Sequence, residues 1–240
     1  MSDTFKVLSA LLCYPTAELK SAAPELKAAL DAEALLPPRV AAMVARLVDD
    51  LATRDLTDAQ ERYVFLFDRT RSLSLHLFEH VHGESRERGQ AMVDLLALYE
   101  RHGLALSARE LPDYLPLFLE FLSTRPVAEA RALLAQPLHI LNALTDRLRK
   151  RDSVYEGVFR ALEALAKDAA PADELEVLPE QAQDDPNDLA ALDRAWEDDP
   201  VTFGPGTDNA GGCGRASEML ARMGNPQQPP AARPAKGQER

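Results

Sequence analysis

The sequence is poor in cysteine, aromatic residues and glycine, and each shortage narrows the class of protein. Only two cysteines are present, Cys13 and Cys213, so neither a disulfide framework nor a paired-cysteine zinc site can be read from the chain. A reducing compartment is therefore expected. Aromatic residues make up 6% of the chain and glycines number 11. Together with abundant alanine and leucine, this composition favours helices joined by short loops.

The chain also lacks a long apolar run and an excess of positive charge. No stretch approaches the roughly 18 apolar residues of a membrane span, and the N-terminus MSDTFKVLSALLCYP has no A-x-A-type cleavage site. The formal net charge is −12, which argues against binding to nucleic acid or to an anionic membrane. We therefore expect a cytoplasmic protein, with no direct membrane insertion and with a cationic partner.

Apolar residues recur at helical spacing from the N-terminus to Ala170, and no convincing alternating strand pattern appears. The expected helix starts are Thr16, Ser85 and the capping boxes at 57–60, 107–110 and 153–156. The expected breaks are Pro15, Pro37-Pro38, Gly83, Gly103, Pro112, Pro116 and Pro137. The sequence thus predicts an all-α, single-domain helical bundle over residues 1–170.

Residues 171–240 differ from the rest in composition. They contain 14 acidic and 6 basic residues, a net charge of −8, which leaves −4 for the chain from Met1 to Ala170. They are rich in proline, aspartate, glutamine and glycine, and they offer too little apolar surface to offset the entropy of ordering. We expect a mostly flexible acidic tail at 171–240, with a short docking helix near 187–199 that uses Leu189, Leu192 and Trp196.

The run SLHLFEHVHGESRER holds the densest group of polar residues, and it admits three interpretations. The spacing His76-x-x-Glu79-His80 is that of a class of zinc peptidases. On a helix, the two histidines would share one face and could bind zinc, with Glu79 as a base. Alternatively, the polar groups hold together a turn at Gly83. In the third interpretation they form the charged rim of a groove with an apolar floor.

The groove interpretation draws on two further stretches of the chain. Asp68-Arg-Thr-Arg71 precedes the histidines, and its alternative is a solvated helix end with a weak ion pair. Asp113-Tyr114 lies between two prolines, and its alternative is a simple Asx turn. His80 and His82 would make binding pH-dependent. The expected client-peptide-binding residues are Tyr63, Asp68, Arg71, His80, His82, Glu84, Arg86, Asp113 and Tyr114.

Three blocks of sequence resemble a known family. They are YVFLFDRTRSLSLHLFEHVHGESRERGQAMVDLLALYERHGL, ELPDYLPLFLEFL and RAWEDDPVTFG. They resemble the TorD/DmsD/NarJ family of molybdoenzyme assembly chaperones, and within it the chaperones of respiratory nitrate reductase. The resemblance runs from about Glu61 to Leu122 and recurs near Trp196. The family's PDHL element stands here as Pro112-Asp113-Tyr114-Leu115, so a role of that histidine in peptide binding does not carry over.

The resemblance implies an all-helical, single-domain chaperone of the TorD/DmsD/NarJ type without catalytic activity. Such chaperones bind the N-terminal peptide of the catalytic subunit NarG in the cytoplasm. They keep it competent for insertion of bis-molybdopterin guanine dinucleotide before it docks at the membrane. They bind no cofactor themselves, and cofactor-delivery proteins are further implied partners.

The groove interpretation is compatible with that role, because a groove with an apolar floor and an acidic rim can bind a basic amphipathic helix. A zinc-dependent hydrolase that uses His76, Glu79 and His80, and a helical adaptor for another client, are the competing hypotheses.

Overall fold

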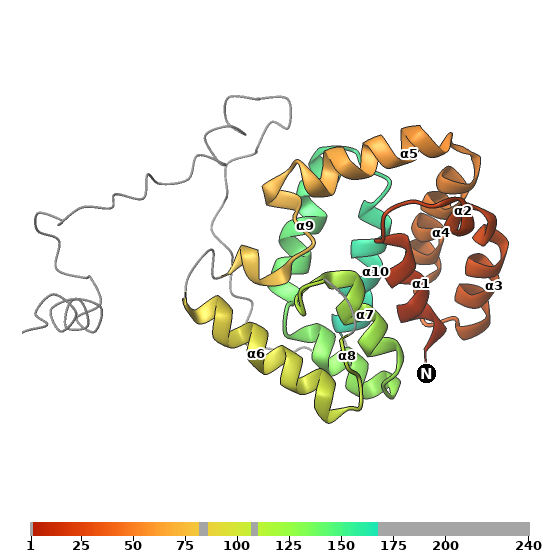
Figure 1. Ribbon diagram of the computed structural model, residues 1–240. Helices are drawn as coiled ribbons and strands as arrows, with labels where there is room; N and C mark the ends of the chain where they lie inside the picture. Colours follow the sequence, from red (N-terminus) through yellow and green to blue (C-terminus); the bar gives the residue numbers. More distant parts are fainter. Residues whose placement is uncertain (1, 82–85, 107–109, 168–240) are drawn as a thin grey trace, which may run out of the picture. The chain divides into compact units, whose positions relative to one another are not determined.

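The computed structural model describes residues 2–81, 86–106 and 110–167, and within these ranges the fold is all-α (Figure 1). The helices are α1 (Asp3–Leu11), α2 (Ala17–Ser21), α3 (Ala23–Glu33), α4 (Pro38–Thr53), α5 (Leu56–Tyr63), α6 (Arg86–Arg101), α7 (Leu115–Ser123), α8 (Val127–Ala135), α9 (Leu138–Lys150) and α10 (Glu156–Lys167). Three short helical segments, η1 (Val64–Asp68), η2 (Arg71–Leu73) and η3 (Leu77–His80), separate α5 from α6. The expected tail at 171–240, its docking helix near 187–199, and the predicted boundaries at Gly83, Ser85 and 107–109 lie outside the described residues.

Prolines and caps set many helix boundaries where the sequence predicts them. α1 ends shortly before Pro15, and the Thr16 hydroxyl accepts the Leu19 N–H at 3.2 Å to cap α2. Pro38 opens α4, and Pro137 separates α8 from α9. Each proline lacks the N–H that a continuous helix would need, so the chain restarts there.

Two predicted boundaries are wrong by a few residues. The helix expected from Thr16 onward is divided at Ala22, because Pro24 has no N–H to continue the hydrogen-bond ladder. The helix expected from the box at 57–60 already begins at Leu56, because the Asp55 carboxylate accepts the Thr57 N–H at 2.8 Å. An aspartate cap two residues upstream thus replaces the predicted threonine cap.

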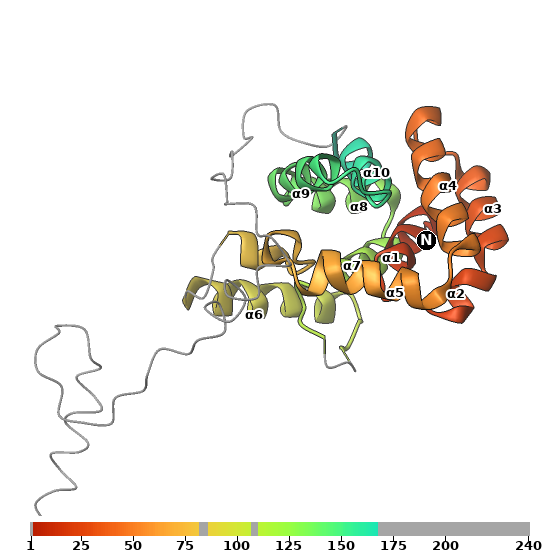
Figure 2. The ribbon, with the colours of Figure 1, turned by 90° about the horizontal axis from the view of Figure 1, so that it is seen from above.

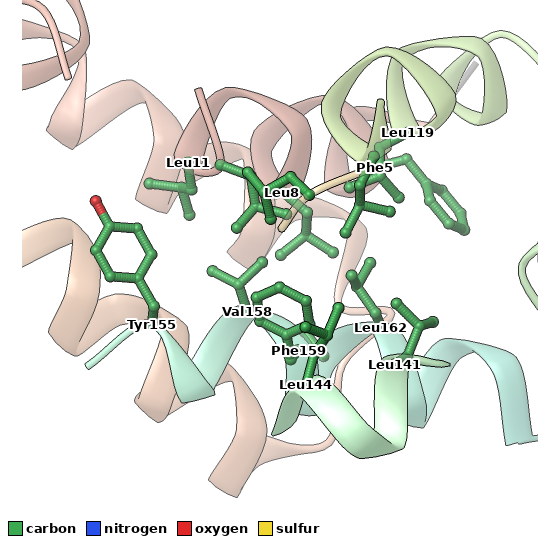
Figure 3. Packing of buried hydrophobic residues seen from close by; sticks show 14 of the residues in the cluster. Phe5, Leu8, Leu11, Leu119, Leu141, Leu144, Tyr155, Val158, Phe159 and Leu162 are labelled. Atoms are coloured by element: carbon green, nitrogen blue, oxygen red, sulfur yellow. The ribbon is translucent and has the colours of Figure 1, made fainter. Parts of the chain in front are cut away.

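The apolar core forms where α1, α7, α9 and α10 meet (Figure 3). α1 packs on α7, and α10 packs on both α9 and α4. The side chains at the centre are fully buried. On each helix, apolar residues recur at helical spacing on the face that meets the other helices. The residues labelled in Figure 3 are Phe5, Leu8, Leu11, Leu119, Leu141, Leu144, Tyr155, Val158, Phe159 and Leu162.

A glycine permits the close approach of α10 to α4. A Cβ atom added at Gly157 would lie 2.8 Å from both the carbonyl carbon and the oxygen of Met43. Backbone atoms cannot move aside as a side chain can, so this position needs glycine for packing.

α3 and α4 lie at one edge of the bundle and α6 lies at the opposite edge, as both views show (Figures 1 and 2). Two contacts tie α6 to the segments around it. The Tyr99 hydroxyl donates to the Pro112 carbonyl at 2.8 Å, and the Arg88 guanidinium donates to the Glu79 carboxylate at 3.3 Å. α6 also keeps an apolar side chain in solvent, because Val93 is 59% exposed.

Candidate functional site

The segment after α5 does not continue as a regular α-helix. α5 widens into the π-helix η1, the chain then forms the 3-10 turn η2, and it becomes extended at Ser74 and His76 before the 3-10 turn η3. π-helical turns are rare and are found frequently at functional sites. The geometry also removes the premise of the zinc hypothesis. His76 has extended backbone angles, so His76 and His80 do not share one face of a helix.

Asp113 is the centre of this region. It is 0% exposed, and its carboxylate accepts the Phe78 N–H at 3.1 Å and faces the His76 Nδ1 atom at 3.2 Å. The backbone of the two stretches pairs as well, through Leu77 N–H to the Asp113 carbonyl at 3.0 Å and Leu115 N–H to the Leu75 carbonyl at 2.8 Å. Asp113 therefore fastens the segment before α7 to the segment before α6. A simple Asx turn, the alternative interpretation of Asp113-Tyr114, would not include these contacts with a distant stretch of the chain.

The two histidines have opposite electrostatic environments. The hydrogen bond to Asp113 raises the pKa of His76 above its ordinary value. Burial lowers the pKa of His80, whose Nε2–H donates to the Ser74 carbonyl at 2.8 Å. His76 is thus stabilised in its protonated form and His80 in its neutral form. A metal ion shared between them would require both rings to leave these partners.

Three tyrosines connect the Asp113 region to the N-terminus. The Tyr63 hydroxyl donates to the Leu12 carbonyl at 2.9 Å, and its oxygen lies 3.2 Å from that of Tyr114. The Tyr14 ring meets the Tyr63 ring edge-on, with centroids 5.6 Å apart. Tyr63 is buried, and this burial raises its pKa. Tyr14, in contrast, is 46% exposed, so the row of rings ends at the surface.

An open groove, here called the α5 groove, lies beside this row of tyrosines. Its volume is ≈ 710 Å³, and Tyr14, Val64 and Phe65 give it apolar surface. The other residues that line it are Thr57, Asp58, Gln60, Glu61, Arg62 and Arg69. The Arg62 guanidinium is paired with Asp50 and lies over the Tyr155 ring, 5.4 Å from its centroid. The groove therefore combines aromatic and apolar surface with side chains of both charges, Asp58 and Glu61 beside Arg62 and Arg69. Apolar surface bordered by charged groups is the arrangement that takes an amphipathic helix.

The nine expected client-binding residues fall into different environments. Tyr63, His80 and Asp113 are buried and bonded to the protein itself, so each supports the surface from below. Asp68 and Arg71 are exposed, and Tyr114 is half-buried. His82 and Glu84 lie outside the described residues, and Arg86 opens α6 with its side chain outside the description. Of the nine, the structure brings Tyr63 and Tyr114 into contact.

The α5 groove contains residues that the sequence reasoning missed. Asp58, Glu61 and Phe65 follow one another at spacings of three and four, so they lie along one side of α5 and its π-helical continuation. That spacing is visible in the sequence. The contribution of Tyr14 is not visible there, because it depends on the packing of its ring against Tyr63, which lies several helices further along the chain.

Neither a metal site nor a membrane-spanning helix is found among the described residues. In that part of the chain, no group of three histidine, cysteine, aspartate or glutamate side chains is arranged to hold a metal ion. Among the helices of the same residues, none combines the length and apolarity needed to cross a lipid bilayer.

The family model and the most similar curated proteins agree on one family. The family model described as nitrate reductase delta subunit matches residues 16–161. The chain is 48% identical over 198 residues to the nitrate reductase molybdenum cofactor assembly chaperone NarJ of Escherichia coli K12, covering 82% of this chain and 83% of that protein. It is 43% identical over 209 residues to the probable chaperone NarW of the same strain, covering 87% and 86%. The probable NarJ of Bacillus subtilis is 31% identical over 159 residues, covering 66% and 85%. The chain belongs to the nitrate reductase delta subunit family.

Proposed function

We propose that this protein is an assembly chaperone that assists insertion of the molybdenum cofactor into a nitrate reductase. The observation that carries the proposal is the α5 groove, lined by aromatic side chains and by the carboxylates of Asp58 and Glu61, in a chain of the nitrate reductase delta subunit family. The chaperone acts in the cytoplasm, by binding rather than by catalysis. The cofactor it serves is bis-molybdopterin guanine dinucleotide, which is held by the client.

The proposed client segment is the N-terminal peptide of the catalytic subunit NarG, bound as a basic amphipathic helix. Its apolar side chains would pack on Tyr14 and Phe65, which supply aromatic surface in the groove. Its cationic side chains would lie near Asp58 and Glu61 on α5. Such rim charges guide association and select the partner, and they add less to affinity than the apolar contacts.

The client-binding residues expected from the sequence divide, in this proposal, into exposed contacts and buried residues that position their neighbours. Asp68 and Arg71 follow the groove along the chain and are exposed, so they remain proposed contacts. Tyr63 supports Tyr14 by ring contact, and Asp113 fixes the segment that carries Tyr114. A change at a buried residue would therefore act on the client through the position of its neighbours.

Calorimetric titration with a synthetic peptide of the NarG N-terminus tests the proposal. We expect saturable binding at micromolar concentrations and none with a scrambled peptide of the same composition. Phe65→Ala and Tyr14→Ala should each weaken binding by about 1–2 kcal/mol, as expected for aromatic anchors. The matched control is Val93→Ala, which removes an exposed apolar side chain from α6.

The result that would overturn the proposal is absence of binding by protein whose helical circular dichroism is intact. Binding that Val93→Ala weakens as much as Phe65→Ala does would place the client elsewhere. A pull-down from nitrate-respiring cells that recovers another protein in place of the nitrate reductase would support the adaptor hypothesis.

A further inference from the structure

The charges that line the α5 groove are divided between its two ends. Asp58 and Glu61 lie on α5, whereas Arg69 directly follows η1. α5 and η1 form one continuous helical stretch (Figure 1). Glu61 and Arg69 are eight positions apart, which is about 12 Å at about 1.5 Å per helical residue. The groove therefore has an acidic end and a basic end.

The charges at the two ends are available to a partner. Glu61 and Arg69 are exposed, and within the described part of the chain neither side chain takes part in a hydrogen bond or an ion pair. Asp58 is exposed as well, although it lies near enough to Arg54 to act on its charge. Glu61 at one end and Arg69 at the other are thus the charges that a bound client reaches most directly.

Two neighbouring charges do not change this division. Arg62 also lines the groove, but its guanidinium is paired with Asp50 and its side chain is only 20% exposed. Asp68 precedes Arg69 in the chain, but it is not among the residues that line the groove, and its charge acts on the hydroxyl of Tyr63.

The dipole of the stretch from α5 to η1 accounts for only part of this pattern. Asp58 lies in the first turn of α5 and Arg69 follows the last residue of η1, and the dipole favours an anion at the start and a cation at the end. Glu61 lies near the middle, where the dipole favours neither sign. Its carboxylate therefore does not serve the stability of the helix that carries it.

We propose that the α5 groove binds its client helix in one direction, with the amino end of that helix at Asp58 and Glu61 and its carboxyl end at Arg69. The inference rests on the proposed function, which names the client segment and leaves its direction open. The amino end of a helix carries the positive pole of its dipole, and an N-terminal peptide adds its α-amino group. The carboxyl end has carbonyl oxygens without partners in the helix, and Arg69 can donate to them. The opposite direction would place each end of the client beside a charge of its own sign.

Photo-crosslinking to the full chain tests the direction. The probes are two versions of the synthetic NarG N-terminal peptide, both amidated at the carboxyl end, with a benzophenone side chain near the amino end in one and near the carboxyl end in the other. The first label should crosslink mainly to residues 57–61 and the second mainly to residues 64–69, each by at least about threefold over the other end. The reverse pattern, or equal crosslinking of both labels to both ends, would overturn the proposal.

A matched pair of variants gives an independent measure of the same contact. Acetylation of the peptide's α-amino group removes its positive charge and should weaken binding to the wild-type protein by about two- to fivefold. Glu61→Gln should reduce that effect of acetylation, whereas Arg69→Gln should leave it intact. An equal effect of acetylation on the two variants would contradict the assigned ends. Both side chains are exposed, so both variants should keep the helical circular dichroism of the wild-type protein.

The same measurements separate the failure of this inference from the failure of the proposed function. Absence of saturable binding by the unlabelled peptide would remove the proposed function and the direction with it. Saturable binding with reversed crosslinks would overturn the direction alone and would leave the proposed function in place.

Discussion

The core where α1, α7, α9 and α10 meet and the segment from Tyr63 to His80 are held by different interactions. In the core, fully buried leucine and phenylalanine side chains pack on one another, and regular helices satisfy the backbone. In the segment, the chain passes through π, 3-10 and extended turns, and polar side chains bind backbone groups. We therefore expect substitutions in the core to change stability most, whereas the segment determines which side chains reach its surface.

The largest expected effect is in the core. Phe159→Ala removes a fully buried ring from α10 and leaves a cavity, so the free energy of unfolding should fall by about 3–5 kcal/mol. Urea denaturation followed by circular dichroism measures it, with Val93→Ala as the exposed control, expected within about 0.5 kcal/mol. A loss below about 1 kcal/mol would mean that α10 does not belong to the cooperative core.

The next effect is at Asp113, the buried carboxylate that binds the segment from Tyr63 to His80. Asp113→Asn weakens the bonds to the Phe78 N–H and to His76, and we expect a loss of about 1.5–3 kcal/mol. Unlike Phe159→Ala, it should also return the pKa of His76 toward its ordinary value, which NMR titration measures. The control is Asp146→Asn, at an exposed ion pair. An unchanged His76 titration would show that Asp113 does not hold the ring.

The two histidines should affect the pH dependence of stability in opposite directions. The pKa of His76 is raised, so its contribution is fully present below about pH 6.5 and is lost as pH rises through the folded-state value. The pKa of His80 is lowered, so stability is lost as pH falls below about 6.5. His76→Asn should therefore destabilise more at about pH 5.5 than at about pH 8, and His80→Gln more at about pH 8, with differences of about 1 kcal/mol or less.

Asparagine and glutamine are chosen for these variants because each places an amide near the ring nitrogen that it replaces. Urea denaturation at the two pH values gives the comparison. Curves for the two variants that shift in the same direction with pH would contradict the assigned environments.

The smallest effect is expected where α6 meets the segment. Arg88→Ala breaks a partly exposed ion pair with Glu79, and the free energy of unfolding should fall by about 0.2–1 kcal/mol. A double-mutant cycle with Glu79→Gln isolates the pair. A coupling energy above about 2 kcal/mol would show that this contact stabilises the segment as strongly as Asp113 does.

Sequence reasoning predicted the fold better than the site. Helical periodicity and prolines identified the all-α class, and the break at Pro137 is confirmed. The helix over His76–His80 that the zinc hypothesis assumed is absent, because a bridge to Tyr114 holds His76 extended. A local pattern carries information about residues within about one turn. The partner of His76 is Tyr114, which follows α6 in the sequence, so no local pattern could predict the pairing.

The candidate site shows the same division between local and distant information. Asp113 and Tyr63 belong to the stretches that carry the family resemblance, yet both are buried supports. The aromatic surface of the α5 groove comes from the exposed Tyr14 and the half-buried Phe65, which sequence reasoning did not select. Composition shows that a residue is polar, but it does not show whether that polar group is turned inward to satisfy a distant N–H.

Local sequence patterns were enough to establish the helical class, the apolar helix faces, the breaks at proline and the family. These features depend on residues within one or two turns of each other. The burial of Asp113, the separate partners of His76 and His80 and the place of Tyr14 beside the α5 groove follow from the packing of the helices. Those outcomes depend on hydrogen bonds and ring contacts between residues that lie far apart in the chain, such as Tyr63 with Leu12, 51 positions away, and they form only when the helices have packed.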